Sequence, residues 1–371
     1  MDFELTQERQ MLQDTLRRFL ADRYDVSVRN DILKSARGQS VQIWQELADL
    51  GVMGALVGED MGGFGGKGFD IAVVFEEMGR AGVVEPLLDC GVLAGGLIAA
   101  LGNESQRALL EDMIGGAVQL AFAHSEVSGR YDPHFVHCTA GTSADGVVLN
   151  GRKAVVINAE AADHIVVSAR EPEGISLFLV PRDTAGIEIQ GYPLLAGARA
   201  AEVVLDGVIL PQTARLGGAG AAQPAIDQAI AAATVAICAE TLGAMETATK
   251  LTREYLVTRK QFGRPIGTFQ ALAHRMSDML IELEQARSAV INAAGHLESD
   301  ARTRDLHMSA AKNLLGRAGR LIAEDSIQMH GGIAMTQEYE LAHIAKRIIM
   351  ADHRFGDEDF HMERFIDLSA A

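Results

Sequence analysis

The sequence is poor in cysteine and in positive charge, and both shortages exclude classes of function. It contains three cysteines, Cys90, Cys138 and Cys238, which lie far apart and outside any CxxC spacing. We expect these thiols to be reduced and mostly buried, as in a cytosolic protein. Lysine and arginine number 33 against 50 acidic residues, which gives a formal net charge of −17. Because nucleic acid requires a basic face, we expect no nucleic-acid partner.

Long hydrophobic runs and clustered histidines are also missing. The longest uncharged apolar run, Cys90 to Gly102, is too short to cross about 30 Å of hydrocarbon as a helix. The first residues are acidic and lack the basic-then-apolar pattern of a signal peptide. The spacings His134/His137 and His353/His361 have no third ligand at a fitting interval, so no zinc site is predicted. We therefore expect a soluble, cytoplasmic protein with no membrane insertion and no bound metal.

The hydrophobic pattern changes twice along the 371 residues and predicts three structural units. From Thr6, a suitable helix N-cap, apolar residues recur with helical spacing to about residue 118. Residues 119–216 hold short β-branched runs, with Asn150-Gly151 as a strong hairpin turn and Asp206-Gly207 as a second candidate. Residues 217–371 return to helical patterns with narrow apolar stripes, typical of a bundle. The prediction is a mainly α fold with a middle β-domain: a helical N-terminal domain (1–118), a small β-sheet or barrel (119–216) and a C-terminal helical bundle (217–371).

A glycine-rich segment, MGGFGGKG from Met61 to Gly68, invites comparison with phosphate-binding loops. Lys67 is not followed by serine or threonine, however, and no β-strand pattern clearly precedes the segment. We interpret it as a tight turn between helices.

Five sequence segments occur in an order that identifies a family. They are GVMGALVGEDMGGFG (51–65), AFAHSE (121–126), LNGRKAVVINAEAAD (149–163), RKQFGRPIGTFQ (259–270) and IQMHGG (327–332). With these segments the chain resembles the acyl-CoA dehydrogenase family along essentially its whole length. The resemblance implies a helical N-terminal domain, a middle β-domain and a C-terminal four-helix bundle, usually in a tetramer that binds FAD. It also implies oxidation of an acyl-CoA thioester to the 2,3-enoyl-CoA. In that reaction a carboxylate removes the α-proton, the flavin accepts a hydride, and an electron-transferring flavoprotein receives the electrons.

Two of the five segments supply the candidate cofactor residues. By the resemblance, the Arg-x-x-Phe-Gly and Gln-x-x-Gly-Gly segments reach across a subunit interface to the diphosphate and adenine half of a neighbour's FAD. A guanidinium can pair bidentately with a diphosphate, and glycines let backbone N–H groups approach its oxygens. On the ring side of the flavin, a serine follows His124 where the family has a threonine. The candidate cofactor-binding residues are Arg259, Gln261, Phe262, Gln270, Gln328, Gly331, Gly332 and, for the flavin ring, Ser125.

The catalytic carboxylate of the family is missing. Its Glu-Gly-Thr segment falls on Phe355, Gly356 and Asp357. The position that carries the base in some other members is matched to Lys260. Neither phenylalanine nor a protonated lysine can abstract an α-proton. Asp357 is the acid that we retain as a candidate for a non-standard base.

Contacts to the flavin ring and the substrate are also reduced. The family's Trp-Ile-Thr-Asn reads Val155-Val156-Ile157-Asn158 here, so an indole and a hydroxyl are absent. Val155 and Ile157 have no polar side-chain atom that could donate a hydrogen bond. A substrate arginine of the family falls on Thr234.

This combination of losses resembles the small, non-catalytic subunits of heteromeric acyl-CoA dehydrogenases, such as the pimeloyl-CoA dehydrogenase small subunit. Related two-subunit enzymes act on steroid side-chain CoA thioesters. The leading hypothesis is an α2β2 assembly in which a second acyl-CoA dehydrogenase subunit supplies the glutamate and the flavin-ring pocket. This chain would supply Arg259, Gln270 and Gln328 to complete the partner's FAD site. The substrate would be a dicarboxylyl-, fatty or steroid side-chain acyl-CoA.

Two alternatives stay open at this point. One is a homomeric acyl-CoA dehydrogenase that uses Asp357 or another acid as its base. The other is a flavin-free structural or acyl-CoA-binding protein that keeps the fold without the chemistry.

Overall fold

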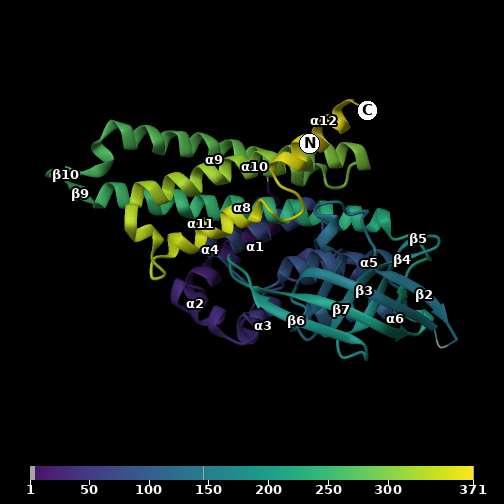
Figure 1. Ribbon diagram of the computed structural model, residues 1–371. Helices are drawn as coiled ribbons and strands as arrows, with labels where there is room; N and C mark the ends of the chain where they lie inside the picture. Colours follow the sequence, from purple (N-terminus) through teal and green to yellow (C-terminus); the bar gives the residue numbers. More distant parts are fainter. Residues whose placement is uncertain (1–4, 145, 371) are drawn as a thin grey trace.

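A computed structural model of the protein describes residues 5–144 and 146–370. Within these residues the chain forms a helical region, a β-sheet and a second helical region, in that order (Figure 1). The expected mainly α fold with a middle β-domain is therefore confirmed. The exact domain boundaries at residues 118 and 216 stay a prediction.

The N-terminal region consists of helices joined by short turns. Thr6 is the N-cap of the first helix, as expected, and its hydroxyl accepts a hydrogen bond from Arg9 N. The three cysteines are unpaired and buried, which confirms the expectation for them. The elements are α1 (Gln7–Arg23), α2 (Val26–Lys34), α3 (Val41–Asp49), η1 (Gly54–Leu56), η2 (Glu59–Met61), α4 (Gly68–Ala81), the π-helical η3 (Leu88–Gly95), α5 (Gly96–Leu101), α6 (Glu104–Arg107) and α7 (Leu109–Ile114).

The glycine-rich segment before α4 is a tight turn that folds back on η1. Gly65 N donates to Val57 O over 3.0 Å, and Gly66 N donates to Ala55 O over 2.9 Å. A Cβ on Gly65 would overlap the carbonyl oxygen of Ala55. The glycines therefore serve close backbone packing, in agreement with the interpretation as a turn.

The middle region is one eight-stranded sheet with the order β6-β7-β3-β2-β4-β5-β8, to which β1 adds by pairing in parallel with β4. Neighbouring strands are otherwise antiparallel except for a short parallel contact of β2 with β4. The bounds are β1 (Leu120–Ala123), β2 (Thr139–Ser143), β3 (Gly146–Ile157), β4 (His164–Glu171), β5 (Gly174–Pro181), β6 (Ile187–Pro193), β7 (Arg199–Leu210) and β8 (Arg215–Leu216), with the short helices η4 (Val127–Gly129) and η5 (Gln212–Ala214) between strands.

The two predicted hairpin turns lie inside long strands. Asn150-Gly151 is in β3 and Asp206-Gly207 is in β7, which pairs with β3. The register shifts between Leu149 and Gly151, and Gly207 N donates to the Asn150 side-chain oxygen over 2.9 Å. Gly151 has a φ of +144°, and a Cβ there would overlap Cys138. The hairpin predictions are wrong, because these glycines permit a bulge between paired strands rather than a chain reversal.

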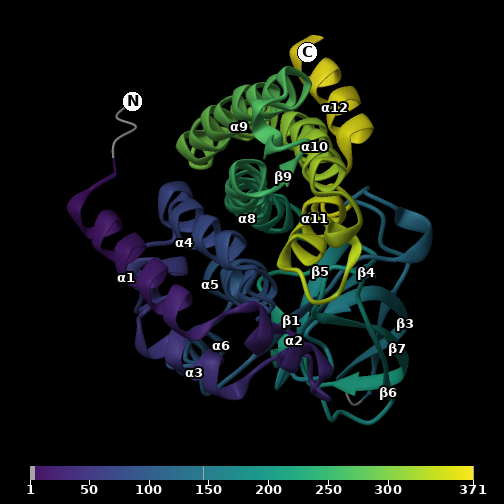
Figure 2. The ribbon, with the colours of Figure 1, turned by 90° about the vertical axis from the view of Figure 1, so that its left-hand side faces the viewer.

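The C-terminal region is a bundle built around α8. Figure 2 shows α8 nearly end-on, surrounded by α4, α9, α10 and α11. By length and composition α8 is apolar enough to cross a membrane, but 83% of its apolar window is buried inside the chain, as in a core helix. The elements are α8 (Gln223–Thr258), β9 (Lys260–Gln261), β10 (Arg264–Pro265), η6 (Ile266–Thr268), α9 (Gln270–His296), α10 (Ala301–His330), η7 (Gly331–Met335), α11 (Glu340–Ala351) and α12 (Glu358–Ala370).

Helices α4 and α8 approach each other through two glycines. A Cβ on Gly79 of α4 would overlap the carbonyl oxygen of Glu240, and a Cβ on Gly243 of α8 would overlap that of Glu76. Each glycine thus admits the backbone of the other helix. This contact joins the N-terminal region to the bundle.

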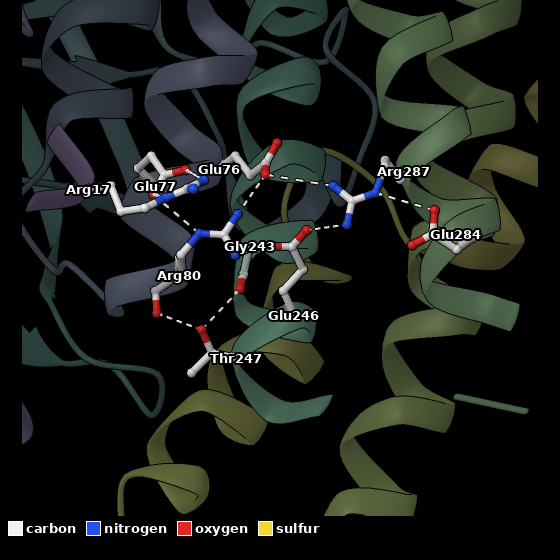
Figure 3. A network of polar contacts seen from close by, with 9 residues as sticks. All are labelled: Arg17, Glu76, Glu77, Arg80, Gly243, Glu246, Thr247, Glu284 and Arg287. Carbon is white, nitrogen blue, oxygen red and sulfur yellow. Dashed lines mark hydrogen bonds and ion pairs between the residues drawn. The ribbon is translucent and has the colours of Figure 1, made fainter. Parts of the chain in front are cut away.

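An ion-pair network surrounds the glycine contact (Figure 3). Arg80 of α4 lies 2.7 Å from Glu76, and both Arg80 and Arg287 of α9 pair with Glu246 of α8. The Thr247 hydroxyl donates to Arg80 O over 2.8 Å. The network therefore links α4, α8 and α9 by charge where they are already in backbone contact.

Candidate functional site

A cavity of about 650 Å³ lies where the three regions meet. Its size is within the range of pockets that bind small molecules and cofactors. Much of its wall is apolar and comes from α4, η3, β1, α8 and α11. These residues are Phe75, Met78, Leu88, Leu93, Phe122, Ile230, Ile237 and Met350.

Charged side chains interrupt the apolar wall as ion pairs. Arg347 of α11 donates from Nε to Oε1 of Glu240 on α8 over 2.8 Å. Arg354 donates from Nη2 to Oδ1 of Asp89 on η3 over 2.8 Å. Burial raises the pKa of Asp89, although Arg354 opposes this effect. All four residues line the cavity, so its interior is polar at defined points.

A third carboxylate, that of Glu85, lines the cavity without an ion-pair partner of its own among the described residues. It accepts hydrogen bonds from the Tyr24 hydroxyl over 2.8 Å and from Ser40 N over 3.2 Å. Burial raises its pKa, and these two hydrogen bonds oppose the rise. Sequence reasoning missed Glu85, Asp89, Glu240 and Arg347, because no local motif marks them.

Phe355, which the sequence resemblance matches to the family's glutamate, lines the cavity. Its φ is +60°, an uncommon conformation for a bulky residue, and Gly356 follows at +112°. Lys312 Nζ donates to the carbonyl oxygens of Asp352 over 2.8 Å and Gly356 over 2.7 Å, and His361 Nε2 lies 2.9 Å from Phe355 O. The segment is thus held in place by α10 and α12. Its benzyl ring forms part of the cavity wall.

Neither of the two alternative positions for the base, Asp357 and Lys260, is among the described residues that line the cavity. Asp357 directly precedes α12, where its Oδ1 accepts a hydrogen bond from Phe360 N over 3.0 Å, and it is not among the cavity-lining residues described. Lys260 is exposed in β9 at the far end of the bundle from the β-sheet (Figure 1). Lys260 is not among the described residues that line this cavity.

Ser125, Val155 and Ile157 all line the cavity, on its β-sheet side. Val155 has a φ of +54°, which is rare for a β-branched residue, at a register shift between Lys153 and Val156. Ser125 O accepts a hydrogen bond from Ala154 N over 2.8 Å, which ties the two segments together. The hydroxyl of Ser125 is the polar side chain that these three positions offer to a flavin ring.

A buried lysine, which sequence reasoning also missed, forms hydrogen bonds with both chain neighbours of Ser125. Lys153 is fully buried, and its Nζ donates to Glu126 Oε1 over 2.8 Å, Ser168 Oγ over 2.9 Å and His124 O over 3.1 Å. Burial lowers the pKa of Lys153. Burial opposes ionisation of Glu126, but the hydrogen bonds from Lys153, Cys138 N and His137 N, together with the charge of Lys153, lower the pKa of Glu126. The sequence signal that could have revealed this group is a lysine at a strand position whose side chain points inward.

The other candidate cofactor residues lie together at the far end of the bundle (Figure 1). Tyr255, near the end of α8, stacks on His330 at the end of α10 with ring centroids 4.4 Å apart. This contact brings the Arg259–Gln270 segment beside the Gln328–Gly332 segment. The side chains here are exposed: Arg259, Gln261, Phe262 (90% exposed), Gln270 and Gln328.

This bundle end is remote from the cavity of the same chain. Arg259 follows α8, roughly 28 Å along the helix from the cavity residue Glu240 at 1.5 Å per residue. At Gly331 and Gly332 nothing lies within 4 Å of where a Cβ would be, so the backbone is open to a bound group. Exposed Arg259 with this bare backbone fits a diphosphate. The Val155 and Ile157 side chains do not fit the polar edge of a flavin ring.

Comparison with known proteins agrees with this architecture. Three family models match: acyl-CoA dehydrogenase, N-terminal domain (residues 6–117), middle domain (121–208) and C-terminal domain (216–366). A similar curated protein is acyl-CoA dehydrogenase IpdE2 of Mycobacterium tuberculosis, 30% identical over 92% of this chain and 91% of the relative. The chain belongs to the acyl-CoA dehydrogenase family.

Two solved structures are similar over nearly the whole chain. The Tcur3481-Tcur3483 steroid ACAD, solved as a variant, is 30% identical, with 98% of each chain covered and a TM-score of 0.89. PigA, solved with FAD and proline, is 25% identical, with 100% of this chain and 99% of that chain covered and a TM-score of 0.92. The family membership confirms FAD as the expected cofactor and an oxidoreductase acting on acyl-CoA as the coarse functional class.

Proposed function

We propose that this chain is the non-catalytic subunit of a heteromeric, FAD-dependent acyl-CoA dehydrogenase. The observation that carries the proposal is Phe355, which lines the cavity of this chain and which the sequence resemblance matches to the family's catalytic position. A benzyl side chain cannot remove an α-proton. A second acyl-CoA dehydrogenase subunit with an intact Glu-Gly-Thr segment would supply that base, in an α2β2 assembly.

The bundle end would complete the partner's cofactor site. FAD, when bound, supplies hydride acceptance from the acyl β-carbon. Arg259 would pair with its diphosphate, Gln270 and Gln328 would hydrogen-bond to the adenine half, and Gly331 and Gly332 would donate backbone N–H groups. The cavity of this chain is too far from these residues for one chain to use both on one FAD. The two-protein name of the similar Tcur3481-Tcur3483 structure supports a partner subunit.

The electron acceptor in this proposal is an electron-transferring flavoprotein, and the site of action is the cytoplasm. The acyl substrate belongs to the dicarboxylyl, fatty or steroid side-chain classes. The word steroid in the name of a similar structure favours the last of these.

The test is flavin content. This chain is expressed alone and together with a second dehydrogenase subunit that carries Glu-Gly-Thr, and FAD per chain and acyl-CoA dehydrogenation are measured. We expect flavin and turnover only in the complex, and Arg259→Ala in this chain should lower the flavin content of that complex. Arg317→Ala, a surface change on α10 at an ion pair with Glu282, serves as control. A full FAD per chain with turnover on this protein alone would overturn the proposal.

The homomeric alternative makes a different prediction for Asp357. If Asp357 is the base, Asp357→Asn abolishes activity. If Asp357 only caps α12, as its hydrogen bond to Phe360 N favours, Asn serves equally well as an N-cap and the activity of the complex is kept. The flavin-free alternative predicts a purified complex without absorbance in the flavin band.

A further inference from the structure

Without a catalytic acid, the cavity of this chain has no assigned role. Its apolar wall nevertheless carries charged side chains at defined points. Arg347 is held by one hydrogen bond, from Nε to Glu240, and its side chain is 14% exposed on the cavity wall. A guanidinium has five N–H donors. Among residues 5–144 and 146–370, the two terminal nitrogens of Arg347 make no hydrogen bond, and its Nε makes the one to Glu240. They are available to a group inside the cavity.

Arg347 belongs to a cluster of six charged residues, which we call the Arg347 cluster. Its members influence one another. Burial lowers the pKa of Arg29 and the charge of Arg347 adds to this effect, while burial raises the pKa of Asp89 and the charge of Glu240 adds to that rise. Arg29 is 5% exposed and lies behind the cavity wall, where it donates to Gly82 O over 3.1 Å and Ala196 O over 3.0 Å. The cluster comprises Arg29, Glu85, Asp89, Glu240, Arg347 and Arg354.

The charges of this cluster balance, with three guanidinium groups against three carboxylates. A negative charge placed at this cluster would have no counter-charge within it, which is costly. Burial already raises the pKa of Glu85 and of Asp89, so this environment disfavours negative charge. A ketone or hydroxyl oxygen can accept a hydrogen bond from Arg347 without changing the balance. Of the other carboxylates of the wall, Glu126 pairs with Lys153, Glu202 pairs with Arg152, and Asp132 accepts a hydrogen bond from His134 N.

The surfaces around the cluster suit an apolar body. Ile237 lies one turn before Glu240 on α8, Met350 follows Arg347 on α11, and Phe75 and Met78 of α4 line the same cavity. A ligand would bury its hydrocarbon against these side chains and direct an oxygen to Arg347. Polar groups at few points in an apolar wall are the usual basis of ligand selectivity.

We propose that the cavity of this chain binds, without turning it over, an apolar acyl group that carries a neutral oxygen function, a ketone or hydroxyl, and that Arg347 selects this group. This inference rests on the proposed function, since it takes the ligand to be an acyl-CoA and Phe355 to prevent its oxidation here. Arg347 and Glu240 both line this chain's own cavity.

The test uses three acyl-CoA probes of equal chain length. Decanoyl-CoA, 9-oxodecanoyl-CoA and decanedioyl-CoA are titrated calorimetrically into the complex, with the partner's Glu-Gly-Thr glutamate replaced by glutamine to stop turnover. The partner's site contributes to every titration, so the informative quantity is the difference between complexes that carry wild-type and variant forms of this chain. We expect the wild-type chain to bind 9-oxodecanoyl-CoA about tenfold or more tightly than decanoyl-CoA, as one hydrogen bond to a charged donor implies.

Two variants separate the role of Arg347 from a general loss of structure. Arg347→Met should abolish the preference for the oxo probe while decanoyl-CoA still binds, and Arg347→Lys should restore part of it. Glu240→Gln removes one negative charge from the cluster, so it should increase the affinity for decanedioyl-CoA. Arg317→Met, at the surface pair with Glu282, should change none of these affinities.

Equal affinities of this chain for the three probes, or no binding to it, would overturn the inference. So would a Glu240→Gln chain whose affinity for decanedioyl-CoA is unchanged. None of these results bears on the flavin content of the complex, which tests the proposed function separately.

Discussion

The ring of Tyr255 stacks on the imidazole of His330, with centroids 4.4 Å apart and planes inclined by 26°. The two residues come from α8 and α10 and are 75 positions apart in the chain. His330 is further placed by its Nε2, which lies 3.2 Å from the Tyr339 hydroxyl. This stack aligns the two segments that we propose to complete a partner's FAD site.

Removing the stack should loosen that half-site without affecting the cavity. Tyr255→Ala should lower the flavin retained by the complex several-fold, because such ring pairs contribute about 0.5–1.5 kcal/mol beyond buried area. The measurement is FAD per complex after gel filtration. Tyr255→Phe keeps the stack and should retain flavin like the wild type, whereas equal loss in both variants would argue against a role for stacking.

The glycine contact between α4 and α8 should tolerate no side chain. Gly79→Ala and Gly243→Ala each place a methyl group on a backbone carbonyl oxygen of the other helix, so each should lower the free energy of unfolding by about 1–3 kcal/mol or more. Urea unfolding followed by circular dichroism measures the change. Gly96→Ala is the matched control, since this helical glycine has nothing within 4 Å of its Cβ position. A Gly79→Ala protein as stable as Gly96→Ala would show that the helices can separate freely.

Stability should decline in acid through two buried histidines. Burial lowers the pKa of His361 to about 3 and that of His124 to about 4. In the unfolded chain a histidine titrates near pH 6.5, so below this pH the unfolded state binds protons that the folded state does not. The free energy of unfolding should therefore fall by about 1.4 kcal/mol per pH unit for each histidine, between pH 6.5 and its folded pKa.

His361→Gln tests this dependence directly. The glutamine amide can still donate to Phe355 O, as His361 Nε2 does over 2.9 Å, but it does not titrate. Urea midpoints from pH 7 to 4.5 should then decline less steeply than in the wild type. His274→Gln changes an exposed histidine and should leave the slope as it is. An unchanged slope in His361→Gln would mean that other groups dominate acid unfolding.

Restoring an acid at position 355 should not by itself make the isolated chain an enzyme. Phe355→Glu places a carboxylate on the cavity wall, but Val155 and Ile157 still offer no hydrogen bond to a flavin ring. We expect no acyl-CoA oxidation by this variant alone with an artificial electron acceptor. Turnover by the isolated variant would support the homomeric alternative instead.

Several features could be predicted from the sequence because they depend on residues near one another. Thr6 caps α1, the apolar spacing outlines the long helices, and the glycines before α4 make a turn. The absence of an acid at Phe355 is likewise visible in a short segment. The sequence alone therefore determined the fold class, the family resemblance and the missing base, since these follow from local composition and motif order.

Tertiary structure alone decided what the remaining residues do. Asn150-Gly151 looked like a hairpin turn, but pairing with β7 makes it a bulge, and strand pairing is not encoded locally. Lysine is usually a surface residue, yet the folded sheet buries Lys153 against Glu126. Arg347 and Glu240 meet only because α11 packs on α8, and the length of α8 separates Arg259 from the cavity. Burial and charge pairing arise from contacts between distant segments, which is why the site of this chain divides into two places.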